Sequence, residues 1–142
     1  MGMLMDSVFS IREAAVESII KVSKESLSQE WLQSIFIEKV KEFGTHERFI
    51  IRIHALFFIN KIAGEVSKEV LNKNFAEVIL ALAEDPVPNI RFNVSKTIDQ
   101  IYTRLTPGNK IKCEGALEKM CKDSDFDVHF YAKVARQKIN KM

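Results

Sequence analysis

A repeat with a period near 40 residues is the feature that most constrains what this chain can fold into. Four stretches align without gaps, at residues 6–12, 46–52, 85–91 and 123–129, and each ends in an aliphatic residue followed by Arg or His. Those last positions lie 40, 39 and 38 residues apart, and an Asp, once a His, lies six residues before each. A fixed period of this length predicts an array of similar supersecondary units.

Apolar residues recur around this motif at the spacing of helices. Three, seven and ten residues after the basic position come mostly apolar residues: Ala15, Ala55, Val94 and Ala132; Ile19, Ile59, Ile98 and the exception Arg136; Val22, Ile62, Ile101 and Ile139. Sixteen, twelve and nine residues before it come further apolar residues: Phe36, Phe75 and Cys113; Val40, Ile79 and Leu117; Phe43, Leu82 and Met120. Each set covers one face of a helix. Each unit is therefore expected to contain a helix A, a tight turn, a helix B and a looser link.

A two-helix unit of this length is typical of HEAT repeats. We predict an all-α fold, an α-solenoid of HEAT repeats in which antiparallel helix pairs stack into a right-handed superhelix. Residues 1–142 form one domain of about three and a half repeats, with units at 1–26, 27–66, 67–106 and 107–142. The first unit lacks most of its helix A, so its helix B would leave a face uncovered. Another protein could cover this face, or a second copy of the chain could cover it by self-association, unless the chain is a fragment of a longer solenoid.

Composition and motifs argue against several functions. The net charge is only +2, which does not favour a nucleic-acid partner or a membrane surface. No apolar run approaches the roughly 20 residues that cross a bilayer. The two cysteines make no disulfide framework, so a cytoplasmic or nuclear protein is expected. The sequence contains no phosphate-binding Gly-rich loop, nucleophile elbow or zinc-binding His pair, so no enzyme activity, metal or cofactor is expected.

Residues 85–96, DPVPNIRFNVSK, resemble the penultimate repeat of the scaffolding A subunits of protein phosphatase 2A, which are HEAT-repeat proteins. Residues 11–15, the pair Glu30–Trp31 and residues 125–128 also fit that family in order and spacing, over nearly the whole chain. The resemblance is to the C-terminal repeats, and it implies a non-catalytic scaffold. In that family these repeats hold the phosphatase catalytic subunit through their intra-repeat turns. The N-terminal repeats hold the regulatory subunit, so no regulatory-subunit site is expected here.

By position, the resemblance implies contacts at the turns between helices A and B, with Val87 the strongest single candidate. The candidates are Val8, Phe9 and Ser10; Glu47, Arg48 and Phe49; Pro86, Val87, Pro88 and Asn89; and Ser124, Asp125 and Phe126. Apolar side chains in tight turns point independently to a pocket on a partner. The turn aromatics Phe9, Phe49 and Phe126 can equally fold back between repeats.

The Arg column has two interpretations. Arg12, Arg52 and Arg91 could bind a ligand, but pairing with the Asp of the same or the neighbouring turn is favoured, because such charges rarely stay unpaired. His46 and His129 replace the expected Asp and basic residue, which makes the pattern less regular in their units.

Two alternative functions remain open. The first is a generic HEAT adaptor that binds another protein or peptide on the concave face formed by the B helices, with its key residues on helices instead of turns. The second is a nucleic-acid enzyme with a basic concave groove, which the near-neutral charge disfavours.

Overall fold

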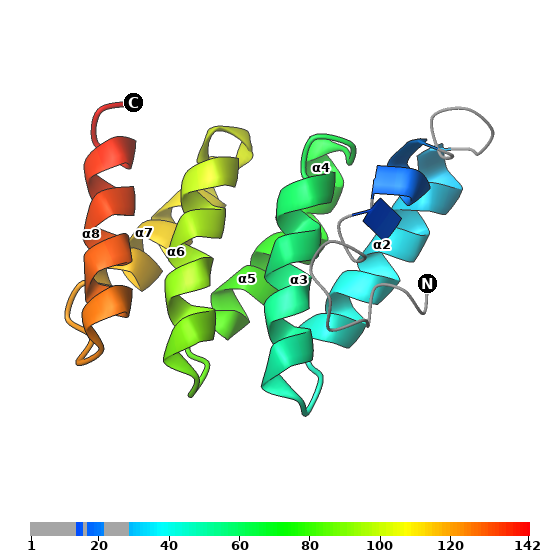
Figure 1. The fold of residues 1–142 in the computed structure, drawn as a ribbon. Coiled ribbons are helices and arrows are strands. Elements are labelled where there is room, and N and C mark those ends of the chain that lie inside the picture. Colours follow the sequence, from blue (N-terminus) through cyan, green and yellow to red (C-terminus); the bar gives the residue numbers. More distant parts are fainter. Residues whose placement is uncertain (1–13, 16, 22–28) are drawn as a thin grey trace.

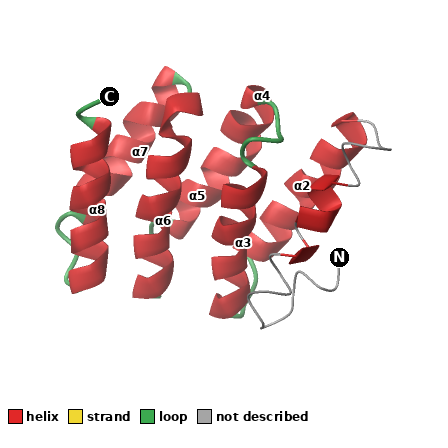
Figure 2. Cartoon of the chain, turned by 45° about the horizontal axis from the view of Figure 1, so that its top comes forward, coloured by secondary structure: helices red, strands yellow, loops and turns green. Residues whose placement is uncertain are grey.

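The computed structural model of the chain describes residues 14–15, 17–21 and 29–142. All elements in this described part are helices joined by short loops (Figure 2). The predictions for Val8, Phe9, Ser10, Arg12 and Val22 lie outside the described residues. Among the residues that are described, no helix is both long and apolar enough to span a membrane.

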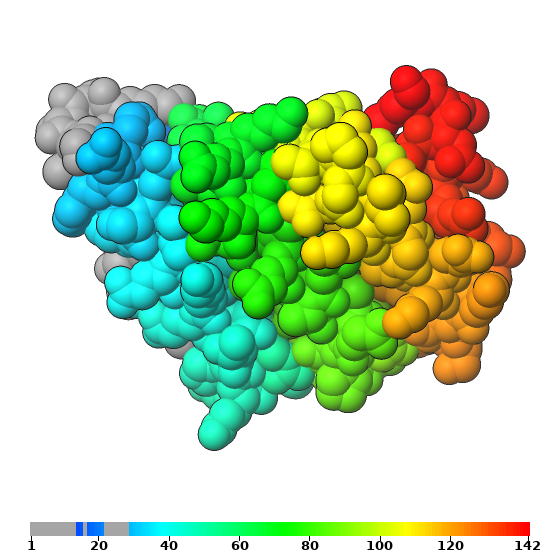
Figure 3. All heavy atoms as spheres, turned by 180° about the vertical axis from the view of Figure 1, so that it is seen from behind, coloured from blue at the N-terminus to red at the C-terminus, as the bar shows by residue number. Residues whose placement is uncertain are grey.

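The helices form two layers. One layer, the A layer, contains α2 (Gln29–Gly44), then a continuous run of α4 (Lys68–Val70), η2 (Leu71–Phe75) and α5 (Ala76–Leu82), and finally α7 (Pro107–Met120). The other, the B layer, contains α3 (Phe49–Ile62), α6 (Pro88–Ile101), which η3 (Tyr102–Arg104) extends, and α8 (Phe126–Ile139). Figure 1 shows α3, α6 and α8 side by side in front of the A layer, and Figure 3 shows the A layer from behind. The predicted all-α solenoid of antiparallel helix pairs is confirmed.

The core lies between the two layers and includes the predicted columns. In the A layer Phe36, Val40, Phe75, Ile79, Cys113 and Leu117 are fully buried. In the B layer Ala55, Ile59, Val94, Ile98 and Ala132 are fully buried, whereas Arg136 is exposed. Phe58 packs its ring edge to face against Phe36, with centroids 5.4 Å apart, and joins α2 to α3. A single helix pair cannot bury these apolar stripes by itself, and the stacking of neighbouring repeats buries them.

Polar side chains join neighbouring repeats at their links. Gln33 of α2 accepts a hydrogen bond from the backbone N–H of Ser67, at 2.8 Å, and Asn72 accepts one from Thr106 N–H, at 2.7 Å. Ser67 and Thr106 are also the N-caps of the helices that follow them. The Asn72 amide donates to Lys68 O at 2.8 Å, the carbonyl that an α-helix would offer to the N–H of Asn72. The same segment contains the π-helical turn η2, after which Ala76 N–H bonds to Leu71 O.

Gly44 ends α2 where it passes closest to α5. A Cβ atom on Gly44 would lie 2.5 Å from Cγ1 of Val78. None of the residues that the structure describes has a positive φ, Gly44 included. Gly44 is therefore required by helix packing and not by backbone conformation.

Candidate partner-binding ridge

The three described intra-repeat turns lie along one edge of the molecule. They connect α2 to α3, α5 to α6 and α7 to α8, and all three are at the lower edge in Figure 1. We call this edge the turn ridge and define it as residues 45–49, 83–89 and 121–126. It is where the resemblance places the partner contacts.

Two arginines hold neighbouring turns together. Arg52 donates from Nε and Nη2 to the two carboxylate oxygens of Asp85, at 2.7 and 3.1 Å. Arg91 does the same to Asp123 in the next unit, at 2.8 and 3.0 Å. Both pairs are mostly shielded from solvent, because no side chain of either pair is more than 15% exposed. The predicted pairing of the Arg column with the Asp of the same or the neighbouring turn is thus confirmed for Arg52 and Arg91, and the partner is the neighbouring turn.

Each guanidinium also organises its own turn. Nη1 of Arg52 donates to the carbonyls of His46 and Glu47, both at 2.9 Å. Nη1 of Arg91 donates to the carbonyls of Asp85 and Pro86, at 2.8 and 3.2 Å. The side chain therefore satisfies turn carbonyls that have no helical partner, and at the same time binds the next repeat.

The aspartates complete this arrangement by accepting backbone hydrogen bonds within their own turns. Oδ1 of Asp85 accepts from Val87 N–H at 3.0 Å, and Oδ1 of Asp123 accepts from Asp125 N–H at 2.9 Å. The hydrogen bonds from Arg91 lower the pKa of Asp123, and the reciprocal bonds raise the pKa of Arg91. Arg52 has its pKa raised in the same way by Asp85. The Arg91–Asp123 pair therefore favours the charged form of each partner.

His46 keeps only part of the aspartate's role. Its Nδ1 accepts from the backbone N–H of Arg48 at 3.1 Å, the same bond that Asp85 makes two residues along its own turn. A neutral imidazole has a single acceptor nitrogen, so it cannot accept two hydrogen bonds from one arginine as a carboxylate does. His129 stands at the Arg position in the last unit of the sequence, where it is half-buried.

The candidate contact residues on the turn ridge differ in how much of each side chain is exposed. Phe126 is 76% exposed and Phe49 is 49% exposed, so both point outward instead of folding back between repeats. These two occupy the first residue of α8 and α3, the position that Pro88 occupies in α6. The other exposed candidates are Glu47, Arg48, Pro86, Pro88, Asn89 and Ser124.

Two candidates have structural roles as well. Val87 is half-buried and packs against the core, so only part of its side chain is exposed. Asp125 is the N-cap of α8, and its Oδ1 accepts from Asp127 N–H and Val128 N–H, at 3.0 and 3.1 Å. Substitution of either residue would therefore affect folding.

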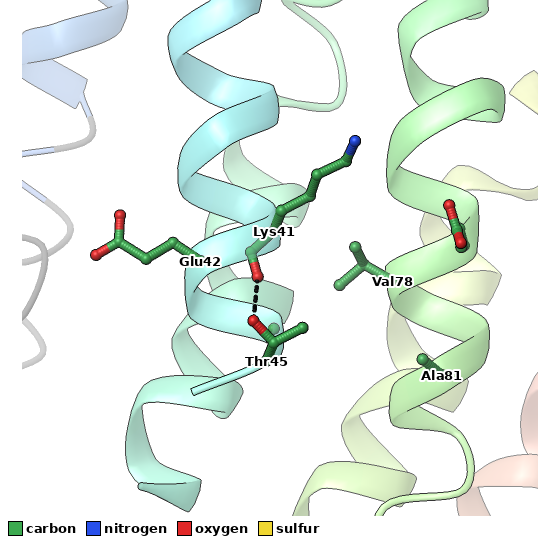
Figure 4. A pocket seen from close by; sticks show the side chains of 7 residues that line it. Lys41, Glu42, Thr45, Val78 and Ala81 are labelled. Atoms are coloured by element: carbon green, nitrogen blue, oxygen red, sulfur yellow. Dashed lines mark hydrogen bonds between the residues drawn. The ribbon is translucent and has the colours of Figure 1, made fainter. Parts of the chain in front are cut away.

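A shallow groove of about 500 Å³ lies beside the ridge on the A layer, between α2 and α5. Figure 4 shows Val78 and Ala81 of α5 facing Lys41 and Thr45 at the end of α2, with Thr45 Oγ1 bonded to Lys41 O at 2.9 Å. The polar side chains that line the groove are not buried, so they give a small molecule little to orient it. Within the described residues, no group of three His, Cys, Asp or Glu side chains is arranged to hold a metal ion.

Sequence reasoning missed one group of residues next to the ridge. Phe92 and Tyr131 stack across α6 and α8 with centroids 5.3 Å apart, and Phe130 packs against Tyr131. The available signal was Phe130 itself, which lies one helical turn after the turn aromatic Phe126.

Comparison with known proteins bears on the resemblance. No protein-family model matches the sequence. The regulatory A subunit of protein phosphatase PP2A from Saccharomyces cerevisiae is 30% identical over 119 residues, covering 77% of this chain and 19% of the yeast protein. Its namesake from Schizosaccharomyces pombe is 33% identical over 72 residues, covering 51% of this chain and 12% of that protein. The chain spans about a fifth or less of the length of these relatives. Over most of its sequence, this HEAT-type solenoid is therefore similar to the regulatory A subunits of protein phosphatase PP2A.

Proposed function

We propose that the chain is a non-catalytic scaffold that binds the catalytic subunit of a 2A-type serine/threonine protein phosphatase through its turn ridge. In this role it helps to assemble the phosphatase holoenzyme. Its mechanism is positioning, since a row of turns at fixed spacing presents several contacts to one partner at once.

The observation that carries the proposal is the way the ridge is built. Arg52 and Arg91 hold each turn to the next, so the turns are already ordered before a partner arrives. Ordering before binding lowers the entropic cost of association. Phe49 and Phe126 then place exposed rings at equivalent positions of two units. The names of the two yeast relatives, which describe phosphatase regulatory subunits, support the choice of partner.

The test is direct binding between the purified chain and a purified 2A-type catalytic subunit, measured by biolayer interferometry. Phe49→Ser combined with Phe126→Ser should weaken binding at least about tenfold, because buried aromatic anchors dominate interface energies. Ile111→Ser is the matched control, since Ile111 is 70% exposed but lies on α7, in the other layer.

Circular dichroism should show that all the variants remain helical. Binding that survives the double substitution would reject the turn ridge as the contact surface. A folded chain with no measurable affinity for the catalytic subunit would favour the generic adaptor. A phosphatase assay of the chain alone should give no activity above buffer.

A further inference from the structure

Four aromatic side chains form a continuous row across α8 and α6. Phe126 and Phe130 stack with centroids 6.2 Å apart. Phe130 meets Tyr131 edge to face at 5.3 Å, and Tyr131 stacks on Phe92 of α6 at 5.3 Å. We call Phe92, Phe126, Phe130 and Tyr131 the aromatic patch.

The two phenylalanines of α8 are not part of the core, whereas Phe92 is half-buried and packs against it. Phe126 is 76% exposed and Phe130 is 47% exposed, whereas α8 buries Val128, Ala132, Ala135 and Ile139 on its other side. The packing of α8 therefore does not require the two phenylalanine rings. Grouped exposed apolar side chains mark interaction sites, while singly scattered ones do not.

Positive charge borders the patch. Nζ of Lys96 lies 4.2 Å from the centroid of Tyr131 and 5.0 Å from that of Phe92. Lys96 is exposed and forms no ion pair with any residue that the structure describes. Lys133 is exposed three residues after Phe130, on the same side of α8. Both ammonium groups are available to an anionic partner.

The carboxylates near the patch do not cancel this charge. Asp99 of α6 is bound to Lys138 of α8 at 2.7 Å, so the one is neutralised by the other. Asp127 is exposed and lies one helical turn before Phe130 and Tyr131 on α8, so it places one negative charge beside the patch against the two lysines. Arg136 and Lys141 add further exposed positive charge at and beyond the end of α8.

We propose that the aromatic patch, with Lys96 and Lys133, is a second binding surface that takes an acidic peptide segment carrying a large apolar side chain. The apolar side chain packs on Phe130 and Tyr131, and the carboxylates flanking it pair with the two lysines. The cation–π contacts hold the Lys96 ammonium over the rings before binding, so less rotamer entropy is lost when a carboxylate arrives. This surface lies mainly on the faces of α6 and α8, and it shares only Phe126 with the turn ridge.

The probe is a short fluorescein-labelled peptide of glutamate and aspartate around one phenylalanine, titrated with the full chain and followed by fluorescence anisotropy. Two further probes replace the phenylalanine by serine, or the acidic residues by lysine. Saturable binding of the first peptide is expected, with binding by both of the others at least about tenfold weaker. Affinity for the first peptide should also fall as salt is raised.

Matched variants separate the patch from general electrostatics. Phe130→Ala is compared with Ile111→Ala, an exposed apolar residue of α7. Lys96→Glu with Lys133→Glu is compared with Lys73→Glu and Lys112→Glu, two exposed lysines of the A layer that give the same change in net charge. Both patch variants should lose at least about tenfold in affinity, and both controls should bind as the unaltered chain does.

Several results would overturn the proposal. They are no saturable binding of the acidic aromatic peptide, equal binding of the serine peptide, and equal loss in the A-layer charge control. Dimerisation of the chain that Phe130→Ala abolishes, without peptide binding, would instead assign the patch to a second copy. Phe49→Ser should leave peptide binding unchanged, so failure of the phosphatase proposal and failure of this one are distinguishable.

Discussion

Arg91 binds two turns with one side chain, through two bonds to the Asp123 carboxylate and two to carbonyls of its own turn. A lysine keeps the charge but cannot reproduce this planar, multiply donating geometry. Arg91→Lys should therefore lower the free energy of unfolding by about 2 kcal/mol, the size of a lost charge-assisted hydrogen bond in a partly shielded site. Urea unfolding followed by circular dichroism measures this. Arg136→Lys, at an exposed position of α8, is the control and should change stability by less than about 0.5 kcal/mol. Equal urea midpoints for the two variants would contradict the structural role of the pair.

The lowered pKa of Asp123 predicts how the stability of the fold responds to acid. Its pKa is lowered in the folded chain, chiefly by the hydrogen bonds from Arg91, so below its ordinary value of about 4 the unfolded state binds more protons. The stabilisation is complete above that ordinary pKa and is lost as the pH falls through the lowered pKa of the folded state. The stability difference between the unaltered chain and Asp123→Asn should consequently be constant from neutral pH to about pH 5 and shrink below about pH 4. Urea unfolding at a series of pH values tests this, with the exposed Glu38→Gln as control. At pH 3 about half or more of such carboxylates are protonated in the unfolded state. A stability difference that stayed the same at that pH would count against the ion pair as its source.

Two glycines on A-layer helices differ in the space around them, so alanine should have opposite effects on stability at the two positions. A Cβ on Gly44 would meet Val78 at 2.5 Å where α2 approaches α5, whereas a Cβ on Gly115 would meet nothing within 4 Å. Gly44→Ala should destabilise the fold by about 1–3 kcal/mol, the range for overpacking. Gly115→Ala should stabilise it by about 0.5–1 kcal/mol, because it improves helix propensity at an open site of α7.

The cause of the Gly44 effect can be isolated with a double-mutant cycle. If the clash with Val78 is responsible, Val78→Ala should relieve it, so that Gly44→Ala costs less in that background than in the unaltered chain. Thermal and urea unfolding of the four proteins give the coupling energy. Additive effects of the two substitutions would show that Gly44 is needed for a different reason.

The sequence predicts the helices and the core well because a repeat samples each position several times. Phe36, Phe75 and Cys113 share one column and are all fully buried. The same repetition predicts that Arg52 pairs with an Asp of the same or the neighbouring turn, and the structure shows the neighbouring one. It does not predict Gly44, whose role depends on the local approach of two helices.

The candidate site was predictable to a lesser degree. The turns lie on one edge as expected, but periodicity does not show that Val87 packs partly inward or that Asp125 is occupied as an N-cap. The aromatic patch was missed for a related reason. Phe92 and Tyr131 occupy different columns of different units, so only the stacking of α6 on α8 brings them together.

The whole molecule is a row of repeats in which each unit contacts its neighbours, so loss of stability should stay local at one end of the row. Leu117 is fully buried in α7 of the last unit, and Ile79 is fully buried at the equivalent position of α5 in the unit before it. Either one substituted by Ala should cost about 2–5 kcal/mol through a core cavity. The two substitutions should nevertheless differ in which amides they expose to exchange. The unit of Ile79 has a described neighbouring unit on each side, whereas the unit of Leu117 has a described neighbour on one side.

Native-state hydrogen exchange measures this difference. Leu117→Ala should speed amide exchange in α7 and α8 while α3 keeps its protection, since α7 and α8 can open without breaking the contacts between α3 and α6. Ile79→Ala should speed exchange in α3, α6 and α8 alike, because its unit packs on both neighbours. Exchange raised evenly along the chain by Leu117→Ala would mean that the described repeats unfold as a single cooperative unit. In that case the turn ridge would be ordered or lost as a whole, and it could not release one contact at a time from a partner.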